Sequence, residues 1–147
     1  MSEVLISTTD LSVHFPLRGG LFGPRLVVRA VENVSVRIEK GSFFGLVGES
    51  GSGKTTFGRA LLLAAPITSG VATYSDDEVT YDLASIARHD LKEYRKRAQL
   101  IFQDPYAALS PRMTVRDIIA EPLEVMGLTN SREETDAKVR EIAAQCR

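Results

Sequence analysis

The sequence has little of several features that would assign it quickly to a special class of protein. It contains no tryptophan and one cysteine, Cys146, so an internal disulfide is excluded and a reducing compartment is favoured. Its longest apolar runs, such as Ala60–Ala65, fall far short of the ~20 residues that a membrane-spanning helix needs. Met1–Asp10 has neither a basic segment nor an apolar one, so no secretory signal is expected.

An excess of charge of either sign is also missing. Lys and Arg number 18 against 19 Asp and Glu, which gives a formal net charge of −1. No surplus of cations is available for phosphates, so nucleic acid is not an expected partner. Hydrophobic residues make up 44% and charged residues 25% of the 147 residues, the ordinary composition of one soluble globular domain. We therefore expect a cytoplasmic protein.

The first forty residues have the pattern of an antiparallel β layer. Val34, Val36 and Ile38 alternate with polar residues, which is typical of a half-exposed strand. Further short strands are expected at Val4–Ile6, Leu11–Phe15 and Val27–Val31, with a loop rich in glycine and proline at Pro16–Arg25. Two apolar runs without alternation predict strands buried on both faces, Phe43–Val47 and Gln99–Gln103.

Helices are expected between and after these strands. The first runs from about Lys54 to Ala65 and is ended by Pro66. A small hairpin is expected from Val71–Tyr74 and Val79–Tyr81, and Asp90 is a candidate N-cap for a helix that ends at Arg97. That helix carries a basic cluster, interpreted either as a solvated face or as a contact for acidic lipid headgroups or a partner: Arg88, Lys92, Arg95, Lys96 and Arg97, with Asp90 and Glu93 among them.

The last third of the sequence is predicted to be helical. Capping-box spacing occurs at Thr114–Asp117 and again at Ser131–Glu134. The apolar face of the last helix is expected to contain Thr135, Val139, Ile142, Ala143 and Cys146, with the cysteine as a small core residue. The predicted fold class is α/β. It combines a P-loop nucleotide-binding core with an N-terminal antiparallel β layer over residues 1–104, and a partial helical subdomain over residues 105–147.

One motif carries chemistry. Residues 48–55, GESGSGKT, match G-x-x-x-x-G-K-[ST] in full, with an apolar run before them and a predicted helix after them. Glycines allow the backbone N–H groups to curl around anionic oxygens, and the helix directs its positive end at the same place. Lys54 would reach the β- and γ-phosphates, the Thr55 hydroxyl would ligate Mg²⁺, and Thr56 could contact another phosphate. The predicted nucleotide-binding residues here are Gly48, Glu49, Ser50, Gly51, Ser52, Gly53, Lys54, Thr55 and Thr56.

Two other interpretations remain open at this point. The motif could be a glycine-rich turn with a solvated lysine. The run Leu100–Asp104 could also be an apolar strand whose final carboxylate holds Mg²⁺, although Gln103 interrupts the run and Pro105 follows at once.

With this loop, the surrounding sequence resembles the ATP-binding subunit of an ABC transporter. The resemblance rests on VGESGSGKTT at residues 47–56 and IFQDP at 101–105, in that order. QDPYAALSPRMTV at 103–115 and IAEPL at 119–123 are similar to the oligopeptide and dipeptide importer branch. The likeness extends from Leu11 almost to Arg147.

The resemblance implies ATP and Mg²⁺ as ligands and assigns several roles. Gln103 would be the Q-loop glutamine, a catalytic residue together with Lys54 and a Mg²⁺ contact together with Thr55. Phe15 is placed where the family has an aromatic ring that stacks on adenine; the alternative for Phe15 is an aromatic side chain buried in the β layer. The implied partners are transmembrane permease subunits, contacted by the segment after Gln103, and a second ATP-binding subunit. The implied location is the cytoplasmic face of a bacterial cell membrane, as a peripheral protein.

The sequence also departs from the family pattern. It has no Ser-Gly-Gly-Gln signature, no apolar strand ending in Asp-Glu and no switch histidine, because His14 and His89 both precede Gln103. The resemblance therefore covers the N-terminal part of such a subunit, and we expect the isolated chain to bind ATP without hydrolysing it. The alternatives are a non-transport P-loop ATPase or kinase, and a non-catalytic nucleotide-binding remnant.

Overall fold

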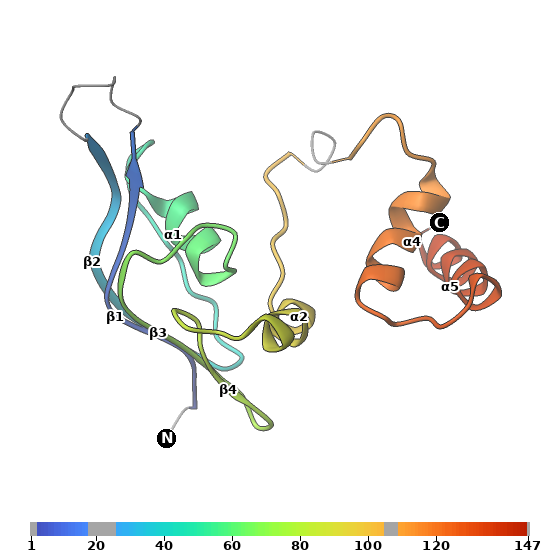
Figure 1. Cartoon of the computed structure of the whole chain (residues 1–147), viewed down its shortest axis with the longest axis horizontal. Coiled ribbons are helices and arrows are strands. Elements are labelled where there is room, and N and C mark those ends of the chain that lie inside the picture. The colour runs from blue at the N-terminus through green and yellow to red at the C-terminus, as the bar shows by residue number, and fades with distance from the viewer. Residues whose placement is uncertain (1–2, 18–25, 105–108, 147) are drawn as a thin grey trace. The chain divides into compact units, whose positions relative to one another are not determined.

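The computed structural model describes residues 3–17, 26–104 and 109–146 (Figure 1). The chain divides into two compact units, Met1–Gln99 and Leu100–Arg147, and each is described by itself. Most of the loop predicted over 16–25 lies outside the described residues. Within the part of the chain that is described, no helix has both the length and the apolar character needed to cross a membrane.

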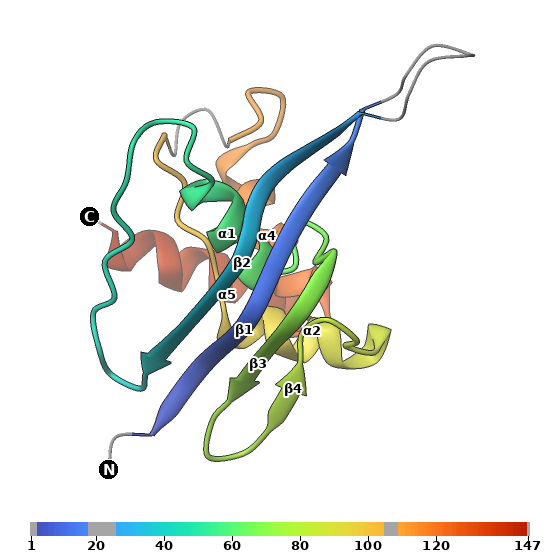
Figure 2. The ribbon, with the colours of Figure 1, turned by 90° about the vertical axis from the view of Figure 1, so that its left-hand side faces the viewer.

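The first unit is built on an antiparallel sheet, as the sequence predicted. Its strands are β1 (Val4–Pro16), β2 (Val27–Glu39), β3 (Ser69–Ser75) and β4 (Thr80–Asp82), in the order β2-β1-β3-β4 (Figure 2). The separate short stretches expected in the first forty residues join into two long strands. Bulges interrupt their register, next to Asp10 and Asn33 in the left-handed region that Asp and Asn tolerate.

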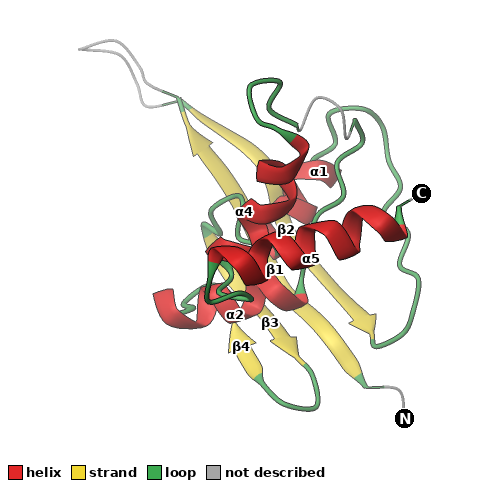
Figure 3. Cartoon of the chain, turned by 90° about the vertical axis from the view of Figure 1, so that its right-hand side faces the viewer, coloured by secondary structure: helices red, strands yellow, loops and turns green. Residues whose placement is uncertain are grey.

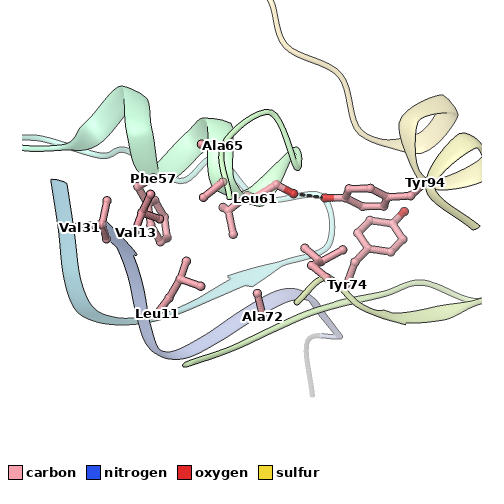
Figure 4. Close-up of a cluster of buried hydrophobic side chains, with 11 residues drawn as sticks. Leu11, Val13, Val31, Phe57, Leu61, Ala65, Ala72, Tyr74 and Tyr94 are labelled. Atoms are coloured by element: carbon pink, nitrogen blue, oxygen red, sulfur yellow. Dashed lines mark hydrogen bonds between the residues drawn. The ribbon is translucent and has the colours of Figure 1, made fainter. Parts of the chain in front are cut away.

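Helix α1 (Lys54–Leu61) lies against one face of this sheet (Figure 4). Its Phe57, Ala60 and Leu61 are buried in one cluster with strand residues such as Leu11 and Val13. The predicted end at Ala65 is wrong, because Leu63 has a φ of 54° and the Ala64 and Ala65 amides both turn back to the Arg59 carbonyl. The helix therefore stops one turn before Pro66.

Helix α2 (Arg88–Arg97) completes the first unit and packs through Tyr94, which is fully buried. Its N-cap is Ala87 in extended conformation, without a side-chain hydrogen bond. The prediction of Asp90 as the N-cap is wrong, because Asp90 lies in the first turn of the helix. Its negative charge there still stabilises the helix by interacting with the positive end of the helix dipole. The predicted hairpin is confirmed, since Asp76 Oδ1 accepts the Glu78 and Val79 amides at 2.9 Å in its turn.

Two predicted buried strands are absent. Phe43–Val47 and Gln99–Gln103 have no regular secondary structure, and Phe43, Val47 and Ile101 are almost fully exposed. A central strand needs neighbours on both sides for its N–H and C=O groups. Among the described residues, no strand pairs with either segment. An apolar composition alone is therefore not enough to make these segments β-strands.

The second unit contains helices α4 (Val115–Val125) and α5 (Arg132–Gln145), coloured as helices in Figure 3. Both predicted caps are confirmed: Thr114 Oγ1 accepts the Asp117 amide and Ser131 Oγ accepts the Glu134 amide, each at 3.2 Å. A small core of Ala120, Leu123 and Val139 joins the two helices.

The predicted apolar face of α5 is correct from Thr135 to Ile142 and wrong beyond it. Thr135 and Val139 are buried and Ile142 packs against the small core, whereas Ala143 and Cys146 are exposed. The prediction of Cys146 as a core residue is therefore wrong. In the described residues, α4 covers the first turns of α5 and nothing covers its last turn.

Candidate nucleotide-binding site

The glycine-rich loop folds around the ammonium group of its own lysine. Lys54 Nζ donates to the Gly48 carbonyl at 2.8 Å, to the Glu49 carbonyl at 2.5 Å and to Ser52 Oγ at 3.3 Å. Lys54 itself is the first residue of α1. The loop therefore curls back over the start of the helix and forms a concave surface with a cation seated in it.

Gly53 is the residue at which the loop passes closest to the sheet. Its φ is 92°, and a Cβ atom built on it would lie 2.1 Å from the Ala30 carbonyl oxygen of β2. A side chain is excluded there both by the left-handed backbone and by the space. This contact fixes the height of the loop above β2, and it is a constraint that the motif spacing alone does not reveal.

The N-terminus of α1 is open for an anion. Its N-cap is Gly53, which supplies no side-chain hydrogen bond, and its first turn holds no acidic residue. The Phe57 amide is bonded to the Gly53 carbonyl at 2.8 Å, while the first amides of any helix lack a carbonyl one turn earlier. The amides of residues 54–56 and the positive helix end therefore face the same side as the loop.

The chemical groups of this site suit a nucleoside triphosphate with Mg²⁺. The groups available at the loop and the first turn of α1 are an ammonium, backbone amides and the hydroxyl side chains of Thr55 and Thr56. This donor set suits phosphate oxygens, and a threonine hydroxyl is a suitable Mg²⁺ ligand. The Glu49 side chain is exposed, and its contact to Lys54 is made by its backbone carbonyl, so its carboxylate does not block the loop.

A cleft runs from this loop along β2. It is lined by Gly48, Ser52, Gly53 and Lys54 of the loop and helix, by the apolar Leu46, Val47 and Phe57, and by residues 29–32 and Val34 of β2. The loop is thus continued by a groove, and a ligand held by its phosphates could extend along the strand.

The charged side chains at this cleft were not predicted from the sequence. Glu32 lies 2.6 Å from His14 Nε2 on β1 and 3.8 Å from the Arg29 guanidinium. No local motif surrounds these residues, and only the pairing of β1 with β2 brings them together. Their position could have been found only from the strand register.

The predicted site residues fall into three groups. Residues 48–56 lie together in the loop and the first turn of α1. Phe15, which is 37% exposed, lies on β1 opposite Val28 and next to His14, whose register partner Arg29 lines the cleft. Gln103 belongs to the second unit, so its place relative to the loop stays a prediction, and residues 105–108 of the expected permease contact lie outside the described residues.

Comparison with known proteins finds similarity to ATP-binding proteins of ABC transporters in both a family model and individual relatives. A family described as ABC transporter matches residues 31–147. The oligopeptide transport ATP-binding protein OppF of Streptococcus mutans is 47% identical over 115 residues, which cover 78% of this chain and 36% of that protein. OppF of Bacillus subtilis is 40% identical over 142 residues, covering 97% of this chain and 44% of that protein. The chain thus spans less than half the length of these curated relatives.

A solved structure shares the fold. The dimeric, post-hydrolysis structure of the ATP-binding cassette MJ0796 bound to ADP and Pi superposes with a TM-score of 0.67 at 22% identity. The match covers 93% of this chain and 55% of that chain.

Proposed function

The chain belongs to the ABC transporter family, as its motifs predicted, and from this premise we propose that it binds ATP as part of an ATPase subunit that energises import of peptides or similar solutes. The observation that carries the proposal is the position of the Lys54 ammonium group. It lies inside the curled loop, within hydrogen-bond distance of the Gly48 and Glu49 carbonyls. The peptide class comes from the names of the relatives, which are oligopeptide transport ATP-binding proteins.

Each residue of the loop has a role in this proposal. Gly48, Glu49, Ser50, Gly51, Ser52 and Gly53 present backbone amides to phosphate oxygens, and Lys54 neutralises charge on the β- and γ-phosphates. The Thr55 hydroxyl holds Mg²⁺ and Thr56 contacts a further oxygen. The bound Mg-ATP supplies a phosphoanhydride bond whose cleavage releases free energy.

Two predicted residues act beyond the loop. Phe15 stacks on adenine, which is supported by the 37% exposure of this residue and by its place on β1, the strand paired with the cleft-lining strand β2. Gln103 contacts Mg²⁺ and orients the attacking water, a role that rests on the family motif. The segment after Gln103 contacts transmembrane permease subunits, and a second ATP-binding subunit completes the ATPase at the cytoplasmic face of the membrane.

The isolated chain binds ATP without turning it over. Phosphoryl transfer needs a positioned water, Mg²⁺ held from two sides and electrostatic stabilisation of the transition state. The 147 residues supply Lys54, Thr55 and Gln103 but contain no Ser-Gly-Gly-Gln signature and no apolar strand ending in Asp-Glu.

The binding part of the proposal is tested by Lys54→Ala. A fluorescent ATP analogue is titrated into the parent chain, into this variant and into Lys138→Ala, which removes a lysine whose one ion-pair partner in the described residues is Glu141 on α5. Loss of a charge-assisted contact of about 1.5–3 kcal/mol predicts an affinity about 10- to 100-fold weaker for Lys54→Ala alone. Equal affinities of all three proteins would reject the phosphate-binding assignment.

The catalytic part is tested by phosphate release at saturating Mg-ATP. We expect the parent chain to release no more phosphate than Lys54→Ala. Turnover above that background would favour the alternative of a complete small P-loop ATPase, with Asp104 as a Mg²⁺ carboxylate. The permease contact is tested separately by cross-linking from a cysteine introduced at the exposed Leu109 in membranes that contain the whole importer.

A further inference from the structure

Helix α2 has an uneven distribution of charge around its axis. Its ten residues include five cations and two carboxylates. Two of the cations have acidic partners: Arg97 contacts Asp76 at 2.7 Å and Glu78 at 2.6 Å, and Lys96 contacts Glu93 at 2.8 Å. These pairs neutralise one end of the helix and, through Arg97, attach it to the β3–β4 hairpin.

The other three cations form a stripe that has no acidic partner among the described residues. Arg88, Lys92 and Arg95, here called the basic stripe, follow one another at spacings of four and three residues. At about 100° and 1.5 Å per residue they share an arc of about 60° over about 10 Å of helix. All three are exposed, and in the described part of the chain no carboxylate lies within 4.0 Å of any of them.

The rest of α2 is arranged so that the basic stripe faces away from the protein. Tyr94 is fully buried, and by helical geometry it lies about 130° around the axis from the stripe. Glu93 and Asp90 lie at least as far from it. The helix is held by the Tyr94 contact to α1 and by Arg97, so the three cations are presented on a fixed, convex surface.

We propose that the basic stripe is a docking surface for the anionic headgroups of a phospholipid bilayer. Three cations on a convex face can meet a flat anionic surface at the same time, and each raises the affinity for such a surface about fivefold. The stripe has no aromatic side chain for stacking on bases, which disfavours nucleic acid. It has no apolar residue to insert, so the attraction is electrostatic and screened by salt. With a net charge of −1, the chain has no general attraction to anions, and the effect is local to α2.

The test uses the full chain without nucleotide, so that its outcome is independent of the ATP site. Co-sedimentation is measured with vesicles of phosphatidylglycerol and phosphatidylcholine in equal parts, and with vesicles of phosphatidylcholine alone. The variant is Arg88→Gln/Lys92→Gln/Arg95→Gln. Its matched control is Arg112→Gln/Arg132→Gln/Arg140→Gln, which removes the same charge from three exposed arginines of the second unit.

We expect the parent and the control to bind the anionic vesicles and the stripe variant to bind about 100-fold more weakly, with binding lost at high ionic strength. Unfolding midpoints of the two variants in urea check that both are folded. Equal losses in both variants, equal binding to phosphatidylcholine alone, or binding to polyglutamate in place of vesicles would overturn the proposal.

Discussion

The Tyr94 hydroxyl donates a hydrogen bond to the Leu61 carbonyl oxygen at 2.5 Å, and so closes the C-terminal end of the helix whose N-terminal end carries the phosphate loop (Figure 4). Both residues are buried. The Tyr94 ring meets Tyr74 and Tyr81 edge to face, at centroid distances of 5.3 and 6.1 Å. Burial raises the pKa of Tyr94 to about 12, so the hydroxyl remains a donor at every ordinary pH.

Replacing Tyr94 by Phe removes only this donor. The Leu61 carbonyl then stays buried without its partner, and we expect a loss of about 1–3 kcal/mol in the free energy of unfolding, measured with urea. Tyr81→Phe is the matched control, since the Tyr81 hydroxyl makes no hydrogen bond within the described residues and its ring stacks in the same cluster. If the two variants were equally stable, the hydrogen bond would contribute nothing.

Gly53 and Gly58 lie five residues apart in sequence, and we expect opposite effects when each is replaced by alanine. Gly53→Ala places a Cβ against the Ala30 carbonyl at a φ of 92°, and we expect a destabilisation of about 1–3 kcal/mol together with weaker ATP binding. Gly58 lies inside α1, where an added Cβ meets no atom within 4 Å, so Gly58→Ala should raise stability by about 0.5–1 kcal/mol. Urea unfolding and nucleotide titration of both variants check the pair. A neutral Gly53→Ala would show that the loop has room to rise from β2.

Phe15→Ala separates base stacking from strand packing. We expect ATP binding to weaken by about 1–3 kcal/mol while inorganic triphosphate, which has no base, binds unchanged. Val28→Ala, on the strand partner of Phe15, is the control and should affect the two ligands alike. Equal weakening of both ligands by Phe15→Ala would place Phe15 in the packing of the β layer.

The Asp76 carboxylate makes the free energy of unfolding depend on pH in the acid range. Its pKa is held well below the usual range, first by the Glu78 and Val79 amides and then by Tyr74 and Arg97. A lowered folded-state pKa means that the unfolded chain takes up the proton first, so this stabilisation is present above about pH 4 and is lost as the pH falls.

The variant that tests this linkage is Asp76→Asn. Urea unfolding as a function of pH should show a shallower loss of stability below pH 4 than in the parent chain, and lower stability at neutral pH. Glu133→Gln is the control, since Glu133 is exposed and makes no hydrogen bond in the described residues. Parallel pH profiles for the parent and Asp76→Asn would contradict the assignment.

Local chemistry explains which parts of the fold were predictable. Thr114 and Ser131 cap their helices as predicted, and Gly53 and Lys54 begin α1 as predicted, because each of these features depends on residues within one turn. The alternation at Val34, Val36 and Ile38 likewise placed β2 correctly. Antiparallel pairing of two strands needs only a nearby connection in sequence.

The failures concern residues whose state depends on distant parts of the chain. Phe43–Val47 has the composition of a buried strand, but pairing partners decide whether it becomes one. Cys146 has helical spacing from Val139, but α4 does not extend to cover it. The Gly53–Ala30 approach and the Glu32–His14 pair arise from strand register, which no local pattern specifies.

The hydrogen bonds that Lys54 makes inside the loop affect which anions can bind there. Because its ammonium already bonds the Gly48 and Glu49 carbonyls, an incoming ligand must exchange with these internal acceptors, and the free energy of binding is the difference between the two sets of contacts. An anion with one charge and few oxygens offers little more than two peptide carbonyls do. A polyphosphate chain brings several charged oxygens to the lysine and to the helix amides at once, so the exchange itself discriminates against small anions.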